Sequence, residues 1–298
     1  DAPALMAPPV GLTYRFGRRI GDRALQNLAR SFLAGSNPAA GRASDSLGRA
    51  LPDLFDVTGL RPGAEAPLPR DVFLPDIQVM VARSAAGSAR GFTLAAKGGH
   101  NAESHNHNDV GHFVLYREGR PVLIDAGVET YSRKTFSRDR YSIWTMQSAF
   151  HNLPIINGVQ QQPGREFQAK EVNCRTTSKR VDFDLDIAHA YPAGAGLKSW
   201  RRSFHFERQA GIVLRDEFDL RRPARSLEWI FMTPCQVQPT AAGLRLAARA
   251  LPQNRSTGEA LLVFHGTQLK ARIESLTIRD PRLAAIWGER LFRIHLTA

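Results

Sequence analysis

The chain has 298 residues, of which 43% are apolar, so it can hold one large domain or one domain with part of another. Its net charge of +12 favours an acidic partner such as nucleic acid, anionic lipid or an acidic polysaccharide. Because the arginines are scattered and no nucleic-acid motif accompanies them, no nucleic-acid partner is expected. No apolar run approaches the ~18 residues of a membrane helix, so no membrane span is expected.

The chain begins with Asp1, and no basic segment followed by an apolar segment comes after it. We therefore expect a piece of a longer protein, whose compartment, periplasmic or cytoplasmic, is not readable from this end. The two cysteines, Cys174 and Cys235, lie far apart and outside any Cys-x-x-Cys pair. We predict two free thiols, since a disulfide would require export.

The N-terminal part of the chain is predicted to be helical. Apolar residues recur at helical spacing over 20–34, and Gly35-Ser36-Asn37-Pro38 ends the run. A second short helix is expected around 46–55. Two helices are too few for an independent domain, so residues 1–60 are assigned to the end of a larger helical domain. The Pro-rich residues 61–73 are assigned to a linker.

From residue 74 to 298 the pattern changes to short, often alternating apolar segments, which are typical of β-strands. More than ten such strands predict a mainly β fold, a large antiparallel, multi-stranded β-sandwich preceded by a few helices. The strands are expected at 77–82, 91–96, 110–117, 121–127, 166–173, 181–189, 200–207, 212–219, 227–231, 244–248, 260–265, 270–278 and 291–295.

Histidines are concentrated in one part of the chain. Of the nine, five lie between residues 100 and 151. Histidine suits both proton transfer near neutral pH and the binding of borderline metals. His105 and His107 belong to a polar run, 100–108, that follows Gly98-Gly99 and enters a strand, so we expect a loop there. In a loop the two side chains can diverge, one serving chemistry and the other a metal.

Asp125 ends the apolar strand that starts near Pro121. Burying an unpaired carboxylate costs several kcal/mol, so Asp125 needs a cation, a metal or several N–H donors. Capping the turn before Gly127 is the alternative. His151 precedes Asn152 and is either a ligand or a member of a loop hydrogen bond. Two histidines and one carboxylate make a plausible zinc set with an open fourth position, and they also suit similar divalent metals.

The pattern does not decide which histidine joins Asp125. A two-residue hairpin turn at Glu118-Gly119 pairs His112 with Asp125 on an ideal ladder. For His107 to reach the metal instead, the chain must leave regular pairing near Gly111, as in a bulge. His107 and His112 therefore stay alternative metal ligands.

The segment 129–141 is long, polar and basic, and it carries Tyr131, Arg133 and Tyr141. Arginine binds carboxylates bidentately, and tyrosine rings pack on sugar faces. The segment is therefore predicted to bind an acidic sugar, with a solvated loop as the alternative. Asn101, in the polar run, is the fourth candidate substrate-binding residue.

Together these motifs resemble the heparinase II/III-like polysaccharide lyases, a group that includes oligoalginate lyases. The resemblance is strongest over 98–160 and extends over 70–298. It implies a helical toroid followed by an antiparallel β-sandwich, with the active site between them and residues 1–60 as the last toroid helices. The motifs are His105-Asn-His107-Asn-Asp109-Val-Gly, Val122-Leu-Ile-Asp125-Ala-Gly, the Tyr131 loop and His151-Asn152.

The resemblance also implies residue roles. His105 would face the substrate, and His107, Asp125 and His151 would bind zinc, which favours His107 over His112 on family grounds. The implied reaction is β-elimination on an acidic polysaccharide that contains uronate, either heparin-like (a glycosaminoglycan) or alginate-like. It needs a neutraliser for the carboxylate, a base, and an acid for the leaving oxygen. In the family, toroid residues supply these groups, so the chain without its N-terminal helical domain is expected to be inactive.

Two other classes of protein use similar residues. One is a non-catalytic carbohydrate-binding β-sandwich with a structural metal site. The other is a cupin-like metal enzyme, which also uses His-x-His on a β-scaffold. A cupin needs a Glu three to four residues after the pair, where this chain has Val110 and Gly111. The cupin interpretation is therefore disfavoured.

Overall fold

The computed structural model describes residues 10–35, 60–62, 67–264 and 268–298. The described residues divide into two compact units, one of residues 70–85, 89–264 and 268–298 and the other of residues 10–35, 60–62, 67–69 and 86–88. The division near residue 70 falls within the stretch that the sequence predicts as a linker. The short helix expected around 46–55 lies outside the described residues.

The smaller unit contains two helices, α1 (Val10–Arg19) and α2 (Arg23–Gly35). The apolar periodicity predicted only the second and placed its start three residues early, at Ile20. The side chain of Asp22 accepts a hydrogen bond from the Leu25 N–H at 3.0 Å, as an N-cap does, and the helix begins after it. Ile20 instead lies in the turn between the helices and is 54% exposed.

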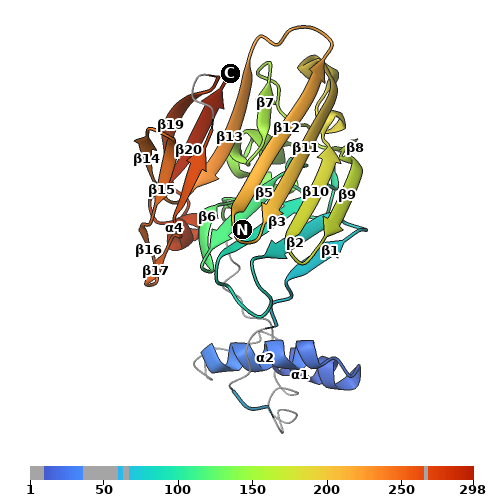
Figure 1. Cartoon of the computed structure of the whole chain (residues 1–298), viewed down its shortest axis with the longest axis vertical. Helices are drawn as coiled ribbons and strands as arrows, with labels where there is room; N and C mark the ends of the chain where they lie inside the picture. Colours follow the sequence, from blue (N-terminus) through green and yellow to red (C-terminus); the bar gives the residue numbers. More distant parts are fainter. Residues whose placement is uncertain (1–9, 36–59, 63–66, 265–267) are drawn as a thin grey trace. The chain divides into compact units, whose positions relative to one another are not determined.

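The larger unit is built of antiparallel strands, which confirms the predicted mainly β fold (Figure 1). The five-stranded sheet has the order β1-β2-β3-β5-β6, with β1 Asp71–Leu74, β2 Val79–Arg83, β3 Phe92–Lys97, β5 Phe113–Arg117 and β6 Arg120–Leu123. A four-stranded sheet has the order β12-β11-β10-β9, with β9 Lys170–Thr176, β10 Arg180–Asp186, β11 Leu197–Glu207 and β12 Gly211–Leu220. A second has the order β19-β20-β13-β7, with β7 Pro154–Ile156, β13 Leu227–Thr233, β19 Lys270–Thr277 and β20 Arg290–Thr297.

Smaller sheets complete the larger unit. They consist of β14 Gln236–Thr240, β15 Gly243–Ala247 and β18 Ala260–Val263; of β16 Ala250–Leu251 and β17 Arg255–Ser256; and of β4 His100–Asn101 and β8 Gly164–Gln168. The helix α4 (Pro281–Trp287) was not predicted, although Asp280 caps it and Pro281 begins it. Among the described residues, no helix combines the length and the apolar character that crossing a bilayer requires.

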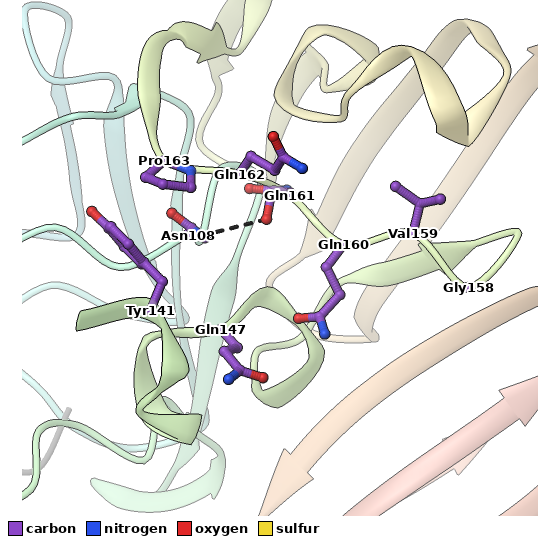
Figure 2. Close-up of a pocket in the computed structure, with 9 residues that line it drawn as sticks. All are labelled: Asn108, Tyr141, Gln147, Gly158, Val159, Gln160, Gln161, Gln162 and Pro163. Carbon is purple, nitrogen blue, oxygen red and sulfur yellow. Dashed lines mark hydrogen bonds between the residues drawn. The ribbon is translucent and has the colours of Figure 1, made fainter. Parts of the chain in front are cut away.

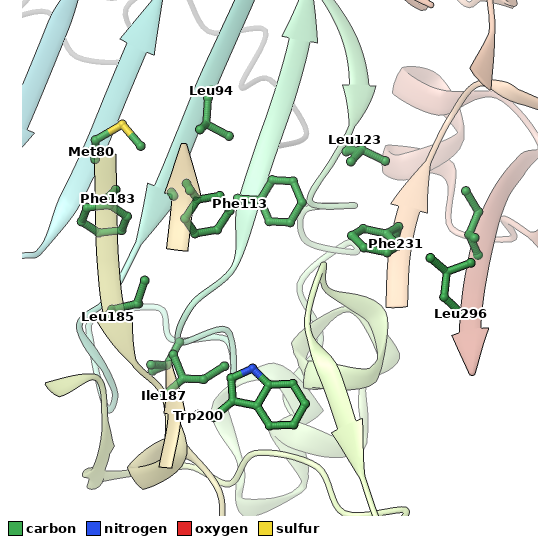
Figure 3. Close-up of a cluster of buried hydrophobic side chains, with 14 of the residues drawn as sticks. Met80, Leu94, Phe113, Leu123, Phe183, Leu185, Ile187, Trp200, Phe231 and Leu296 are labelled. Carbon is green, nitrogen blue, oxygen red and sulfur yellow. The ribbon is translucent and has the colours of Figure 1, made fainter. Parts of the chain in front are cut away.

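One apolar core joins the three larger sheets (Figure 3). Phe113 of β5 contacts Phe204 of β11 and Phe231 of β13, with ring centroids 5.1 Å and 6.2 Å apart. Phe73 of β1 contacts Phe183 of β10 at 6.1 Å. Because each contact joins rings from different sheets, the sheets pack face to face as in a sandwich. Both cysteines are free thiols, as predicted.

Candidate metal centre

A tight turn ends the histidine-rich loop before β5 begins. The His112 N–H donates to the Asp109 carbonyl at 3.0 Å, and Gly111 between them has a φ of +84°. A side chain at Gly111 would also be crowded, since its Cβ would lie 2.8 Å from Ile187. The chain therefore leaves regular pairing at Gly111, which is the condition for His107 to approach Asp125.

The hairpin ladder also departs from the ideal one. Arg117 pairs with Arg120 as predicted, but the register shifts so that Leu115 pairs with Leu123. The shift is a β-bulge, and the expected direct pairing of His112 with Asp125 was therefore wrong. His112 still lies close, with its Nε2 4.0 Å from Asp125 Oδ2.

His107, Asp125 and His151 form a group of ligand atoms that can hold a metal ion. His107 Nδ1 and His151 Nε2 lie 3.2 Å apart, and Asp125 Oδ2 lies 3.7 Å and 3.3 Å from them. In a tetrahedral zinc site with bonds of about 2.0–2.1 Å, the ligand atoms lie about 3.3 Å apart. The spacing of the three donors therefore fits one small divalent ion.

The protonation of His151 suits a ligand. Its Nδ1 lies 2.8 Å from the Gln147 carbonyl, which can only accept a hydrogen bond, so Nδ1 carries a proton. In the neutral ring, Nε2 then has a free lone pair, and this atom faces His107 and Asp125. Burial acts to lower the pKa of His151, but the Asp125 carboxylate, Asp109 and the Gln147 carbonyl together outweigh it and raise that pKa above its usual value. The group thus attracts a positive charge, whether a proton or a metal ion.

The protonation of His112 argues against a ligand. Its Nδ1 accepts the Asn152 N–H at 2.9 Å, and burial holds the pKa of His112 well below its usual range. The neutral ring must then carry its proton on Nε2, which leaves that atom without a lone pair for a metal. Nε2 is buried without a hydrogen-bond partner, and Asp125 Oδ2 is 4.0 Å away. These contacts favour His112 as a neighbour of Asp125 over His112 as a metal ligand.

Asp125 combines the two roles that its sequence position suggested. Its Oδ1 accepts the Gly127 N–H at 2.6 Å, which caps the turn after β6. Its Oδ2 faces the histidines. The turn thereby fixes the carboxylate, so Oδ2 stays directed at His107 and His151.

His105 lies in the loop between β4 and β5, with an exposed side chain. Its φ of +57° is uncommon for a residue other than glycine, and such backbone strain often occurs at functional sites. His107, two residues later, is only 11% exposed at its side chain. The two side chains therefore differ in environment, as the irregular loop predicted: His105 is open to solvent and His107 faces Asp125 and His151.

Asn101 supports the loop from inside. It is fully buried, its Nδ2 donates to Gln161 Oε1 and the Gln162 carbonyl, and its Oδ1 accepts the Asp109 N–H. Lys97 adds ion pairs to Glu103 and Asp109 at 3.1 Å and 2.8 Å. Support of the loop therefore fits Asn101 better than the substrate contact that the sequence suggested.

The basic segment 129–141 folds into short 3₁₀ turns, η2 (Arg133–Phe136) and η3 (Arg138–Ser142). Tyr131 is 45% exposed, and the guanidinium of Arg282 lies over its ring. The hydroxyl of Tyr141 accepts a hydrogen bond from Asn106 Nδ2 at 3.1 Å, so this tyrosine contacts the histidine-rich loop. Arg133 is exposed.

A pocket of about 450 Å³ is lined by residues that adjoin the metal group in the chain or in space (Figure 2). Asn108, the residue after His107, lines it, and so does Gln147, whose carbonyl lies against His151. Figure 2 shows Tyr141 and Asn108 on one side of the pocket and Gln160 on the other. The lining is polar but uncharged, and consists of Asn108, Tyr141, Gln147, Gly158, Val159, Gln160, Gln161, Gln162 and Pro163.

Comparison with known proteins identifies the family. The family described as heparinase II/III-like, C-terminal, matches residues 66–280, which is more than half of the chain. The chain therefore belongs to this family of polysaccharide lyases. A search of curated proteins finds no match.

Solved structures share the fold at low identity. Heparan sulfate lyase HepC from Pedobacter heparinus is 16% identical with a TM-score of 0.55, and the match covers 92% of this chain and 38% of that one. A crystal structure of heparinase III is 14% identical with a TM-score of 0.58, and the match covers 96% and 39%. The chain thus spans less than half the length of these proteins.

Sequence reasoning missed several residues that build the site. Gln161 is buried and bonds both Asn101 and the backbone of Val110, yet it lies in an ordinary Gln run. Arg202 is 1% exposed. A signal for Arg202 exists, because strand alternation places it on the same face as the apolar Trp200 and Phe204.

Proposed function

We propose that the chain is the β-sandwich part of a lyase that cleaves a uronate-containing acidic polysaccharide by β-elimination. The observation that carries the proposal is the group His107, Asp125 and His151 beside the exposed His105, in a chain of this lyase family. The named relatives act on heparan sulfate or heparin, which makes a glycosaminoglycan the first substrate to test.

Zinc is the proposed metal. Two imidazole nitrogens and one carboxylate oxygen leave a fourth position open in a tetrahedral site. When bound, the metal would supply a positive charge that attracts the donor atoms of His107, Asp125 and His151. It would thereby hold the loop that carries His107. Since His107 and the exposed His105 are two residues apart, holding His107 also holds the backbone of His105.

His105 is the proposed catalytic residue of this chain. Removal of the proton beside a uronate carboxylate requires charge neutralisation and proton transfer, and a solvent-exposed histidine can contribute to either. The remaining base, acid and neutraliser are proposed to come from a helical domain of the same protein. Tyr131, Arg133 and Tyr141 are proposed to contact the sugar, because arginine pairs with carboxylates and tyrosine packs on sugar rings.

The uncharged lining of the pocket suits a saccharide. Amide and hydroxyl groups both donate and accept hydrogen bonds, which suits the hydroxyls of a sugar. The pocket adjoins the metal group through Asn108 and Gln147. A polysaccharide chain that reaches His105 is therefore proposed to extend into it.

The test is the activity of the longer protein that contains this chain and the helical domain before it. Heparan sulfate, chondroitin sulfate and alginate are supplied separately, and the unsaturated uronate product is followed by its ultraviolet absorbance. The proposal expects new absorbance with at least one polymer and its loss in His105→Ala. The matched control is His205→Ala, since His205 lies on β11 and pairs with Asp182.

A non-catalytic carbohydrate-binding sandwich is the second candidate. It is favoured only by the polar pocket and the metal group, which both candidates would use. It predicts saccharide binding without new absorbance on any polymer. The same assay therefore separates the two candidates.

A further inference from the structure

Arg202 is a buried cation in the middle of the sandwich. It lies on β11, where strand alternation directs it inward with Trp200 and Phe204, and it is 1% exposed. An arginine in such a place costs free energy unless it is paired and fully hydrogen-bonded. Its partners therefore show what its presence stabilises.

One side of the guanidinium binds Asp216, its cross-strand partner on β12. Nε donates to Oδ1 at 2.9 Å and Nη2 to Oδ2 at 2.7 Å, and the indole N–H of Trp229 also donates to Oδ2 at 2.8 Å. The bidentate pair fixes the plane of the guanidinium. The remaining nitrogen, Nη1, is thereby aimed in one direction.

Nη1 donates to two carbonyls from distant segments of the chain. It lies 3.1 Å from the Gly111 oxygen and 2.9 Å from the Asn152 oxygen. Gly111 belongs to the turn that follows the His107 loop, and Asn152 directly follows His151. One atom therefore joins the two segments that carry the histidine ligands.

Further contacts make this junction rigid. The backbone N–H of Asn152 donates to His112 Nδ1 at 2.9 Å. The side-chain amide of Asn152 donates from Nδ2 to the Phe113 carbonyl and accepts the Met232 N–H at Oδ1, both at 2.6 Å. A shift of the Arg202 side chain would release the Gly111 and Asn152 carbonyls together. Arg202 would then no longer fix the separation of His107 from His151.

We propose that Arg202 is a positioning residue for the metal centre, setting the distance between the His107 and His151 ligands through the Gly111 and Asn152 carbonyls. The inference rests on the metal centre in the proposed function, but not on the lyase activity. Within the described part of the chain, Arg202 forms no hydrogen bond with the side chains of His107, Asp125 or His151.

The experiment measures Co²⁺ binding by the purified chain, because cobalt reports both affinity and coordination geometry through its absorption spectrum. Arg202→Met is expected to weaken Co²⁺ binding by about 10–100-fold, the usual effect of losing an outer-shell partner, and to alter the spectrum. Since Arg202→Met leaves Asp216 buried without its cation, the double variant Arg202→Met/Asp216→Asn is measured as well. Arg202→Lys tests rescue, and incomplete rescue is expected because lysine cannot bind bidentately.

Arg208 provides the matched control. It is also nearly buried, with 6% exposure of its side chain, and it binds Asp71 with Nη2 at 2.9 Å to both oxygens. Its other contacts are carbonyls outside the metal segments, including Ser178 and Thr177. Arg208→Met is therefore expected to lower thermal stability and to leave Co²⁺ affinity within about twofold of wild type.

Two results would overturn the proposal for Arg202. One is wild-type affinity and spectrum in the folded Arg202 variants. The other is an equal loss of affinity in Arg208→Met, which would mean a general effect of stability. If the wild-type chain bound no cobalt, the metal centre and the role of Arg202 would fail together, whereas lyase activity of the longer protein would still be tested separately.

Discussion

His107 Nδ1 lies 3.2 Å from His151 Nε2, although the two residues are 44 positions apart in the chain. The proton on His151 Nδ1 leaves a lone pair on its Nε2 when the ring is neutral, and this lone pair can accept a hydrogen bond from a protonated His107 Nδ1 or bind a metal ion together with it. Asp125 Oδ2, 3.3 Å from His151, adds a negative charge to the same place. The arrangement is therefore one that a metal ion completes.

His105→Ala in the longer protein should lower kcat by roughly two or more orders of magnitude and leave metal content and thermal stability nearly unchanged. The reason is that the His105 side chain is exposed and takes part in no hydrogen bond or ion pair with the residues that the structure describes. Steady-state kinetics with metal analysis checks both parts. Loss of metal or unfolding in this variant would contradict the catalytic role.

The chain alone should show little or no lyase activity. It spans 38–39% of the length of the similar heparinase structures, and the proposed base and acid lie outside it. Catalysis needs all reacting groups within hydrogen-bond reach of the substrate. Turnover by the purified 298-residue chain would show that the helical domain is not needed.

Gly111→Ala should destabilise the larger unit more than Gly158→Ala does. Both glycines have positive φ, +84° and +74°, and a side chain there costs about 1–2 kcal/mol. At Gly111 a Cβ also meets Ile187 at 2.8 Å, whereas at Gly158 nothing lies within 4 Å. The crowding adds about 1–3 kcal/mol to the loss at Gly111. Denaturant unfolding of the two variants measures the difference, and equal losses would show that the turn absorbs the methyl group.

Glu274→Gln should lower stability at neutral pH but not in acid. Burial acts to raise the pKa of Glu274, but hydrogen bonds from His295 and Arg293 outweigh it and hold that pKa below its usual value of 4.5. A lowered folded-state pKa stabilises the protein above the unfolded-state value, and this contribution is lost as pH falls through the folded-state pKa.

Thermal melts of wild type and Glu274→Gln, recorded from neutral pH into acid below pH 4.5, provide the measurement. The two curves should converge below pH 4.5. The control is Glu259→Gln, because Glu259 is an exposed partner of Arg245 at 3.4 Å and should change little at any pH. A difference in melting temperature between wild type and Glu274→Gln that persists in acid would show that the substitution acts through packing and not through charge.

The sequence predicted the mainly β sandwich because strand alternation is a local property. It also placed His107, Asp125 and His151 in one metal site, but only through the family resemblance. Pattern alone left His107 and His112 as rivals, since an ideal ladder ignores the bulge between β5 and β6. The tautomer of His112 depends on the Asn152 N–H, a contact between residues 40 positions apart. No local pattern reports such a contact.

Other parts of the prediction failed for similar reasons. The strand expected at 110–117 begins only at Phe113, because the turn at Gly111 is held by Lys97 through backbone hydrogen bonds. The stretch 166–173 contains the end of one strand and the start of the next, β8 and β9. The alternation of apolar and polar residues is similar on both sides of the break between β8 and β9. The sequence pattern therefore predicts one strand where the fold has two.

Metal analysis of the purified chain tests the central claim most directly. The account predicts about one equivalent of zinc or a similar divalent metal, with loss of that metal in His107→Ala, Asp125→Asn and His151→Ala. His112→Ala should retain it, because His112 carries its proton on the nitrogen nearest the site. Full occupancy in His107→Ala together with loss in His112→Ala would transfer the ligand role to His112 and contradict the account.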